Sequence, residues 1–232
     1  MKIAILVDGG FYRKRAKYCF GEKSGIEAAN DLYNYSRLHL KDGPKGRYVT
    51  NDLYRIFYYD APPVSKKVYH PLLKRTIDFS KSKEYKWMND FLKELTKKRK
   101  VALRLGYLAE NFAHYNLKYD IIKKLFNNSI TISDIKENDF ELNVKQKTVD
   151  MKIGLDIASL AFKKQVDQIV LIAGDGDFVP AAKLARREGI DFIVDSMGRK
   201  INDSLFIHID GFNTKIKLFN KRYKINTKEV NE

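Results

Sequence analysis

Residues 168–196, QIVLIAGDGDFVPAAKLARREGIDFIVDS, contain two short apolar runs separated by a helical pattern. The runs at 168–173 and 191–196 are apolar at consecutive positions, which is typical of strands that are covered on both faces in a parallel sheet. Between them, Pro180 falls in the first turn of the predicted helix, and Gly189 falls where a helix commonly ends. A strand, a helix and a second strand in this order predict a right-handed parallel crossover.

The same alternation extends through the rest of the chain. Further β-branched apolar runs predict strands, and amphipathic stretches predict helices that start at Ser82 and Thr148. The other predicted strands are 2–7, 53–59 and 101–106. Together these elements predict an α/β fold with a doubly wound, mostly parallel sheet between two layers of helices, which is a Rossmann-like three-layer arrangement.

The length of 232 residues suits a single domain with elaborations. Two stretches, at about 61–100 and 107–147, depart from the alternation and are interpreted as insertions; the second includes a probable extra strand, FELNVKQ. The first of them carries 12 Lys and Arg against 4 Asp and Glu. We therefore expect a domain over 1–212, with basic elaborations, and a basic C-terminal extension over 213–232.

The charge balance points to a polyanionic partner. The chain has 44 Lys and Arg against 29 Asp and Glu, a formal net charge of +15, which predicts binding to nucleic acid. The single cysteine, Cys19, excludes an internal disulfide and a cysteine-based zinc site. The sequence shows neither a signal peptide nor an apolar run long enough to span a membrane, so a cytoplasmic protein without a membrane partner is expected. A homo-oligomer is left open.

Four aspartates lie at or beside the predicted strand ends. Asp8 directly follows the first strand, and Asp175 and Asp177 alternate with glycines after the fourth. Asp150 lies in the first turn of a predicted helix, on its inward apolar face. Because ligands of open parallel sheets bind beyond the carboxyl ends of the strands, these four side chains are expected to share one crevice.

Grouped carboxylates repel one another unless a cation neutralises them. A site rich in oxygen ligands and free of histidine and cysteine suits Mg²⁺ or Mn²⁺, and such ions activate water for phosphodiester hydrolysis. Taken singly, each acid also has a structural interpretation: Asp177 as a helix N-cap, Asp150 as a partner of the helix dipole, and Asp8 as a turn residue. Their joint occurrence favours the site.

Five motifs resemble the NYN domains of the LabA-like group, which belong to the PIN-like superfamily of metal-dependent ribonucleases. They are ILVDGGFY (5–12), YYDAPP (58–63), KTVDMKIGLDIASLA (147–161), LIAGDGDFVPAAKLARREG (171–189) and SLFIHIDGF (204–212). The resemblance implies a PIN-like fold. It also implies that the acidic set that holds the metal and carries catalysis is Asp8, Asp150, Asp175 and Asp177.

The same resemblance maps Lys147 onto the lysine that commonly precedes the helical aspartate, where it would hold a phosphate or steady a neighbouring acid. Thr148 stands where the family often has glycine, and we expect it to cap the helix. Ser204, in the closing motif, is expected to order the backbone or contact substrate.

Residues 11–20, FYRKRAKYCF, alternate basic and aromatic side chains directly after Asp8. This composition suits a surface that grips phosphates and stacks bases, and it makes Arg13 and Lys14 candidate substrate-binding residues. An ordinary amphipathic helix with a solvated basic side is the alternative.

Three further aspartates are expected to lie outside the site. Asp156 lies six residues after Asp150, on a different side of the helix, and is expected to make a structural contact. Asp60 is interpreted as a turn residue, and Asp195 as a peripheral acid or part of a solvated loop. The four histidines show no metal-ligand spacing.

These observations predict a metal-dependent, endoribonuclease-like phosphodiesterase with Mg²⁺ or Mn²⁺ as cofactor and RNA, ahead of DNA, as substrate. The first alternative is a non-catalytic nucleic-acid-binding or regulatory protein on the same fold, and the second is a phosphohydrolase of small molecules. The sequence leaves open endo- or exonucleolytic action, the number of metals and the pathway.

Overall fold

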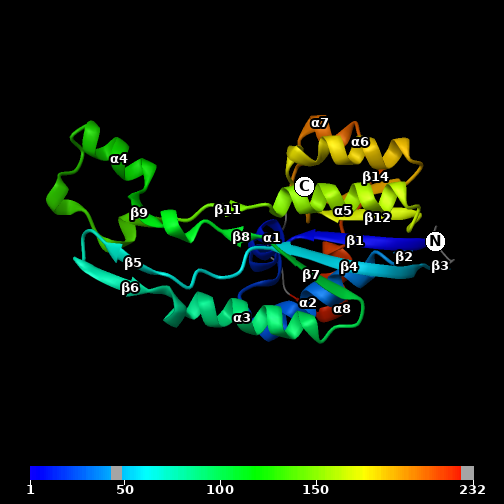
Figure 1. Cartoon of the computed structure of the whole chain (residues 1–232), viewed down its shortest axis with the longest axis horizontal. Coiled ribbons are helices and arrows are strands. Elements are labelled where there is room, and N and C mark those ends of the chain that lie inside the picture. Colours follow the sequence, from blue (N-terminus) through cyan, green and yellow to red (C-terminus); the bar gives the residue numbers. More distant parts are fainter. Residues whose placement is uncertain (43–48, 226–232) are drawn as a thin grey trace.

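A computed structural model describes residues 1–42 and 49–225, and it shows an α/β body from which an arm projects (Figure 1). Within these residues, six strands form one central sheet in the order β14-β13-β12-β1-β4-β7, and every neighbouring pair is parallel. The strands are β1 (Lys2–Asp8), β4 (Asp52–Asp60), β7 (Val101–Leu105), β12 (Gln168–Ile172), β13 (Asp191–Asp195) and β14 (Gly211–Phe212). The predicted fold class is confirmed, and the five predicted strands are present.

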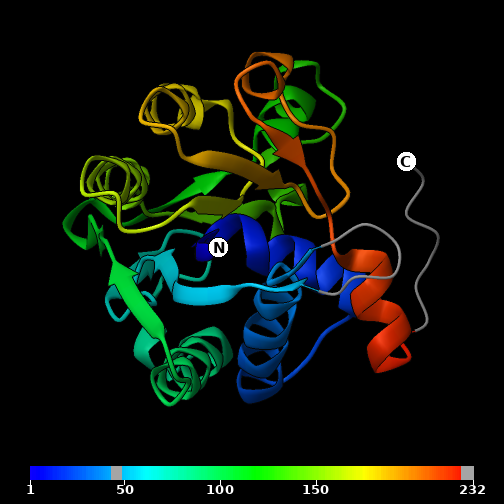
Figure 2. The same ribbon diagram turned by 90° about the vertical axis from the view of Figure 1, so that its right-hand side faces the viewer.

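Helices cover both faces of the sheet, which gives three layers (Figure 2). One face packs against α1 (Gly9–Phe20), α2 (Gly25–Leu38), α3 (Lys83–Thr96) and α8 (Ile216–Tyr223), and the other against α5 (Val149–Phe162), α6 (Val179–Arg187) and α7 (Asp203–Phe206). In β1, Ile5 packs into the first core and Leu6 into the second, and both are fully buried. A strand buried on both faces therefore appears in the sequence as a continuous apolar run.

The order in which strands are added to the sheet reverses between β1 and β12. From β1 the chain builds outward through β4 and β7, and it then returns to the other side of β1 to build β12, β13 and β14. Val7 lies opposite Ile172 in this central pair. The two chain segments that leave β1 and β12 therefore start side by side at the switch point where ligands bind in such sheets.

The arm extends from the carboxyl ends of β4 and β7 (Figure 1). It contains the hairpin of β5 (Lys67–His70) and β6 (Arg75–Asp78), the pair of β9 (His114–Leu117) and β10 (Phe140–Asn143), and α4 (Tyr119–Phe126). Its small core contains His70, which is 1% exposed and whose ring centroid lies 4.3 Å from that of Tyr115. The pair of β8 (Tyr107–Leu108) and β11 (Gln146–Lys147) joins the arm to the body.

The two stretches interpreted as insertions are placed differently by the structure. Most of residues 107–147 lies in the arm, whereas residues 61–100 contribute both to the arm and to the body, because Phe91 and Leu95 of α3 are fully buried in the core. The remaining short elements are β2 (Lys41–Asp42), β3 (Val49–Thr50), η1 (Phe79–Lys81), η2 (Glu110–Phe112), η3 (Ile132–Asp134), η4 (Glu137–Asp139) and η5 (Gly176–Phe178).

Near the C-terminus, α8 packs Phe219 into the first core. Residues 226–232 of the predicted C-terminal extension lie outside the described residues. Among residues 1–42 and 49–225, no helix has the length and apolar character that crossing a bilayer requires.

Candidate functional site

Asp8 lies at the carboxyl end of β1 and caps the helix that follows. Its Oδ1 accepts a hydrogen bond from the Phe11 amide at 3.1 Å, so α1 begins directly beside the carboxylate. Burial raises the pKa of Asp8; the Phe11 amide opposes the rise, and the charges of Asp150 and Asp60 add to it. Asp8 bonds its own following backbone as the turn interpretation expected, but as a helix N-cap rather than in a turn. The same side chain also lies in the field of Asp150 and Asp60.

Asp60 ends β4 beside Asp8 and is 1% exposed. Arg13 donates to it from Nε at 2.9 Å and from a terminal nitrogen at 3.1 Å, and the Tyr58 hydroxyl donates to it at 2.6 Å. The interpretation of Asp60 as a turn residue alone is wrong, because its carboxylate forms a buried ion pair. Arg13, predicted to bind substrate, is held in this pair, although 36% of its side chain stays exposed.

Gly9 makes this packing feasible because a Cβ there would lie 2.5 Å from both Asp60 Oδ2 and the Tyr58 hydroxyl. We expect Gly9→Ala to destabilise the fold by about 1–3 kcal/mol, since the added methyl must displace a buried ion pair. The matched control is Gly154→Ala in the interior of α5, where no described atom beyond the neighbouring residues and the backbone of the same helix lies within 4 Å of the new Cβ. That variant should gain about 1 kcal/mol. Urea unfolding of both proteins measures the difference, and equal midpoints would contradict the prediction.

Asp175 and Asp177 lie in the loop after β12, and both are exposed. Asp175 accepts a hydrogen bond from the Asp177 amide at 3.2 Å and so caps the short turn η5. The N-cap of α6 is Phe178, without a side-chain bond, so the interpretation of Asp177 as that cap is wrong. A Cβ on Gly174 would lie 2.5 Å from the Phe11 ring. The loop therefore packs on the first turn of α1, beside Asp8.

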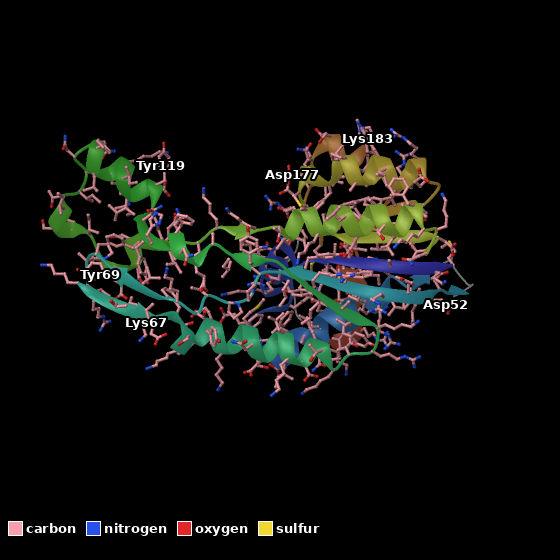
Figure 3. All side chains as sticks on the ribbon, viewed as in Figure 1. Asp52, Lys67, Tyr69, Tyr119, Asp177 and Lys183 are labelled. Atoms are coloured by element: carbon pink, nitrogen blue, oxygen red, sulfur yellow. The ribbon has the colours of Figure 1, made fainter. Side chains whose placement is uncertain are left out.

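Asp150 links the acids from the other layer of helices. Its side chain is exposed in the first turn of α5, so the expectation that it lies on the inward apolar face is wrong. Partial desolvation and then the charges of Asp175 and Asp177 raise its pKa. The charge of Asp150 also raises the pKa of Asp8, so Asp150 lies within electrostatic reach of the other three predicted acids. Figure 3 places Asp177 at the end of the body from which the arm leaves.

The acidic group does not form a ready-made coordination sphere. Within residues 1–42 and 49–225, no three His, Cys, Asp or Glu side chains are arranged to hold a metal ion. The donor set nevertheless consists of carboxylate oxygens, the ligands that Mg²⁺ and Mn²⁺ prefer. These carboxylate oxygens repel one another, and a bound cation would relieve that repulsion.

Lys147 lies exposed in β11, three residues before Asp150. Its carbonyl oxygen would lie 2.5 Å from a Cβ on Gly106, so the backbone enters α5 through a close approach that requires glycine. Thr148 follows with a φ of 71° and makes no side-chain cap bond. The expectation that Thr148 caps the helix is wrong; its left-handed backbone is one that glycine adopts without strain.

The other two candidate substrate-binding residues occupy different surroundings. Lys14 lies exposed on α1. The Ser204 hydroxyl donates to Asn202 Oδ1 at 2.8 Å, within the cap of α7. Asn202 in turn lies 3.1 Å from the position of a Cβ on Gly176, so Ser204 helps to order the backbone beside the loop of Asp175 and Asp177.

Asp195 is fully buried at the end of β13, so the interpretation as a peripheral or solvated acid is wrong. It accepts from the Tyr35 hydroxyl at 2.6 Å and from the Met197 amide at 2.7 Å, and it lies 2.9 Å from His39 Nε2. Asp156 makes the structural contact that was expected, because Arg104 and the Tyr59 hydroxyl bind it at 2.9 Å and 2.8 Å.

Residues 64–213 match the NYN domain. This range includes Asp150, Asp175 and Asp177, and it begins after Asp8. No curated protein matches the sequence. Among solved structures, a protein of unknown function from Vibrio parahaemolyticus is similar, with 15% identity, a TM-score of 0.45, and coverage of 91% of this chain and 90% of the other.

Proposed function

Because the chain belongs to the NYN domain family, we propose that it is a metal-dependent ribonuclease that hydrolyses phosphodiester bonds. NYN domains are in general nuclease-like domains, and the family implies a nucleic-acid substrate, RNA in particular. The five motifs that resemble the LabA-like group support a place in that group. The net charge of +15 suits a polyanionic substrate.

One observation carries this proposal: the loop of Asp175 and Asp177 packs on the first turn of α1 beside Asp8, and Asp150 lies within electrostatic reach of Asp8, Asp175 and Asp177. Asp8 and Asp175 are held by cap hydrogen bonds, so their carboxylates are fixed before substrate arrives. Structural roles alone do not require the charge of Asp150, because burial and its neighbours make its ionised form unfavourable. Such groups are more typical of functional sites than of stabilising ones.

In the proposed mechanism, Asp8, Asp150 and Asp175, together with Asp177, are the residues that would hold the metal. When bound, Mg²⁺ or Mn²⁺ supplies a polarised water and stabilises negative charge on the phosphoryl oxygens. The carboxylate of Asp177 makes no hydrogen bond or ion pair with any described residue, so its oxygens are available to accept a proton from the attacking water. Lys147 and Lys14 are both exposed, and their positive charges would attract the phosphates on either side of the scissile bond.

A second function, nucleic-acid binding without cleavage, is favoured by a specific observation. Across the described residues, no three acidic or histidine side chains are already arranged for a metal. A binding protein would keep the basic surface and the fold without needing that arrangement.

Metal dependence separates the two functions. We expect the protein to cut labelled single-stranded RNA with Mg²⁺ or Mn²⁺ and to stop cutting when EDTA is present, because phosphoryl charge is then no longer neutralised. Hairpin RNA and single-stranded DNA, assayed in parallel, define the substrate preference. If RNA binds equally well under every condition and is never cut, the binding function replaces the nuclease.

A further inference from the structure

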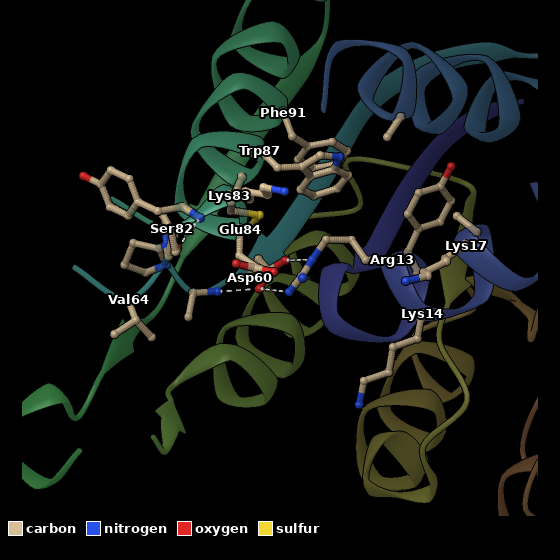
Figure 4. A pocket seen from close by; sticks show the side chains of 18 of the residues that line it. Arg13, Lys14, Lys17, Asp60, Val64, Ser82, Lys83, Glu84, Trp87 and Phe91 are labelled. Atoms are coloured by element: carbon tan, nitrogen blue, oxygen red, sulfur yellow. Dashed lines mark hydrogen bonds and ion pairs between the residues drawn. The ribbon is translucent and has the colours of Figure 1, made fainter. Parts of the chain in front are cut away.

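A groove of about 740 Å³ lies between α1 and α3, where the arm joins the body. Its volume falls within the range of small-ligand sites. Figure 4 shows its two sides, with Arg13, Lys14 and Lys17 on α1, with Lys83, Glu84 and Trp87 on α3, and with Asp60 between them. The proposed mechanism uses only Lys14 of these residues. The sequence predicted a substrate role for Arg13 and Lys14 on the α1 side of the groove, and no motif predicted the α3 side.

The groove connects directly to the acidic group. Asp60 lines it, and Asp60 Oδ2 lies 2.5 Å from the position of a Cβ on Gly9, the residue after Asp8. The charge of Asp60 also acts on Asp8. The groove therefore lies next to Asp8, on the side of Asp60.

One wall of the groove is aromatic and rigid. The ring of Trp87 stacks on that of Phe91, with centroids 5.2 Å apart and planes 10° apart. Its indole nitrogen donates to the Lys23 carbonyl at 2.8 Å, which fixes the ring in place. Tyr12, which is 1% exposed, also lines the groove, and its hydroxyl has no hydrogen-bond partner among the described residues. A flat aromatic wall suits a planar ring such as a nucleic-acid base.

The unpaired charges that line the groove are net positive. Three of its cations are paired with acids: Arg13 with Asp60, Lys17 with Glu22, and Lys23 with Asp31. Lys14 and Lys83 have no ion-pair partner in the described part of the chain, and Glu84 is the single acid that opposes them. The first turn of α3, with its positive dipole end, begins beside Lys83 after the Ser82 cap.

We propose that this groove binds a nucleotide of single-stranded RNA next to the scissile bond, with the base on the Trp87 wall and the flanking phosphates near the exposed lysines Lys14 and Lys83. This inference rests on the proposed function, because the nucleotide placed in the groove is next to the scissile bond of the same RNA substrate. Single strands are required, since the base reaches the wall only when it is unstacked and unpaired.

Trp87 is the single tryptophan of the chain, so the tryptophan fluorescence of the protein reports on this wall of the groove. EDTA is added so that the RNA can bind without being cut. Under this condition, binding of a short single-stranded oligouridylate should quench Trp87 fluorescence. Lys14→Gln and Lys83→Gln should each weaken that binding by about 3- to 10-fold, and each should reduce the salt slope by about 0.7. The matched control is Lys183→Gln, an exposed lysine on the opposite helical layer, which should change binding by less than about 2-fold.

The outcomes separate this inference from the nuclease function. Quenching by RNA in a protein that never cleaves supports the groove and removes the nuclease. Metal-dependent cleavage with unchanged Trp87 emission, and with both lysine variants equal to Lys183→Gln, overturns the groove and leaves the nuclease intact. Equal quenching by duplex RNA, or a lack of RNA binding, also overturns the groove.

Discussion

Asp150→Asn is expected to slow RNA cleavage by about 100-fold or more while RNA still binds. The charge of Asp150 acts on Asp8, and the charges of Asp175 and Asp177 act on it, so Asp150 connects the two chain segments of the site. The amide keeps the shape of the side chain and removes the charge that would hold the cation. Cleavage rates at saturating metal, with binding measured separately in EDTA, give the two quantities.

The same variant has a second readout in its thermal stability. The pKa of Asp150 is raised in the folded protein by burial and by Asp175 and Asp177, so its ionised form is less favourable in the folded than in the unfolded chain. For an acid with a raised pKa, this penalty grows as the pH rises through the titration range. Asp150→Asn removes the penalty, and its melting temperature at neutral pH should be no lower than that of the wild type.

The matched control is Asp156→Asn, on the same helix and outside the acidic group. Asp156 holds Arg104 and the Tyr59 hydroxyl, so its loss should lower the melting temperature and leave cleavage within about 3-fold. If both variants lost cleavage equally, distortion of α5 rather than the missing charge would explain the effect, and Asp150 would leave the proposed metal site.

The central sheet was predictable because its signals are local. Strands buried on both faces give continuous apolar runs, and Pro180 and Gly189 mark the ends of the helix between two of them. Residues that directly follow such runs must lie at one edge of a parallel sheet, which is why Asp8 and Asp175 could be placed near each other. The strand β14 has only two residues, which is too short to show an apolar pattern, so the sequence did not predict it.

Partners that lie far apart in sequence were not predictable. Arg13 and Asp60 are separated by 47 residues, and the sequence suggested a substrate role for one and a turn role for the other. Their pairing depends on the side-by-side placement of β1 and β4 and on the missing side chain of Gly9. The groove likewise requires α1 and α3 to lie on the same face of the sheet, which no local pattern specifies.

Asp195 is the clearest case of such a long-range arrangement, and its removal should have the largest effect on stability. The carboxylate is fully buried, and its partners Tyr35 and His39 lie 160 and 156 residues earlier in the chain. The Tyr35 hydroxyl also accepts a hydrogen bond from the Lys215 amide at 3.3 Å, at the start of α8. One acid thus ties the end of β13 to α2 and, through Tyr35, to the C-terminal helix.

Asp195→Ala should cost about 3–5 kcal/mol, because it leaves a buried hydroxyl, an imidazole and an amide without their acceptor. At this chain length the loss corresponds to a fall in melting temperature of roughly 6–20 °C. Asp203→Ala, at an exposed position in α7, is the control and should stay within about 0.5 kcal/mol of the wild type. Asp195 lies on the same sheet edge as the acidic group, so cleavage must be measured as well. An Asp195→Ala protein that melts like the wild type but no longer cuts RNA would make Asp195 part of the reaction chemistry, whereas a large drop in melting temperature identifies it as the buried acceptor that fastens the helices to the sheet.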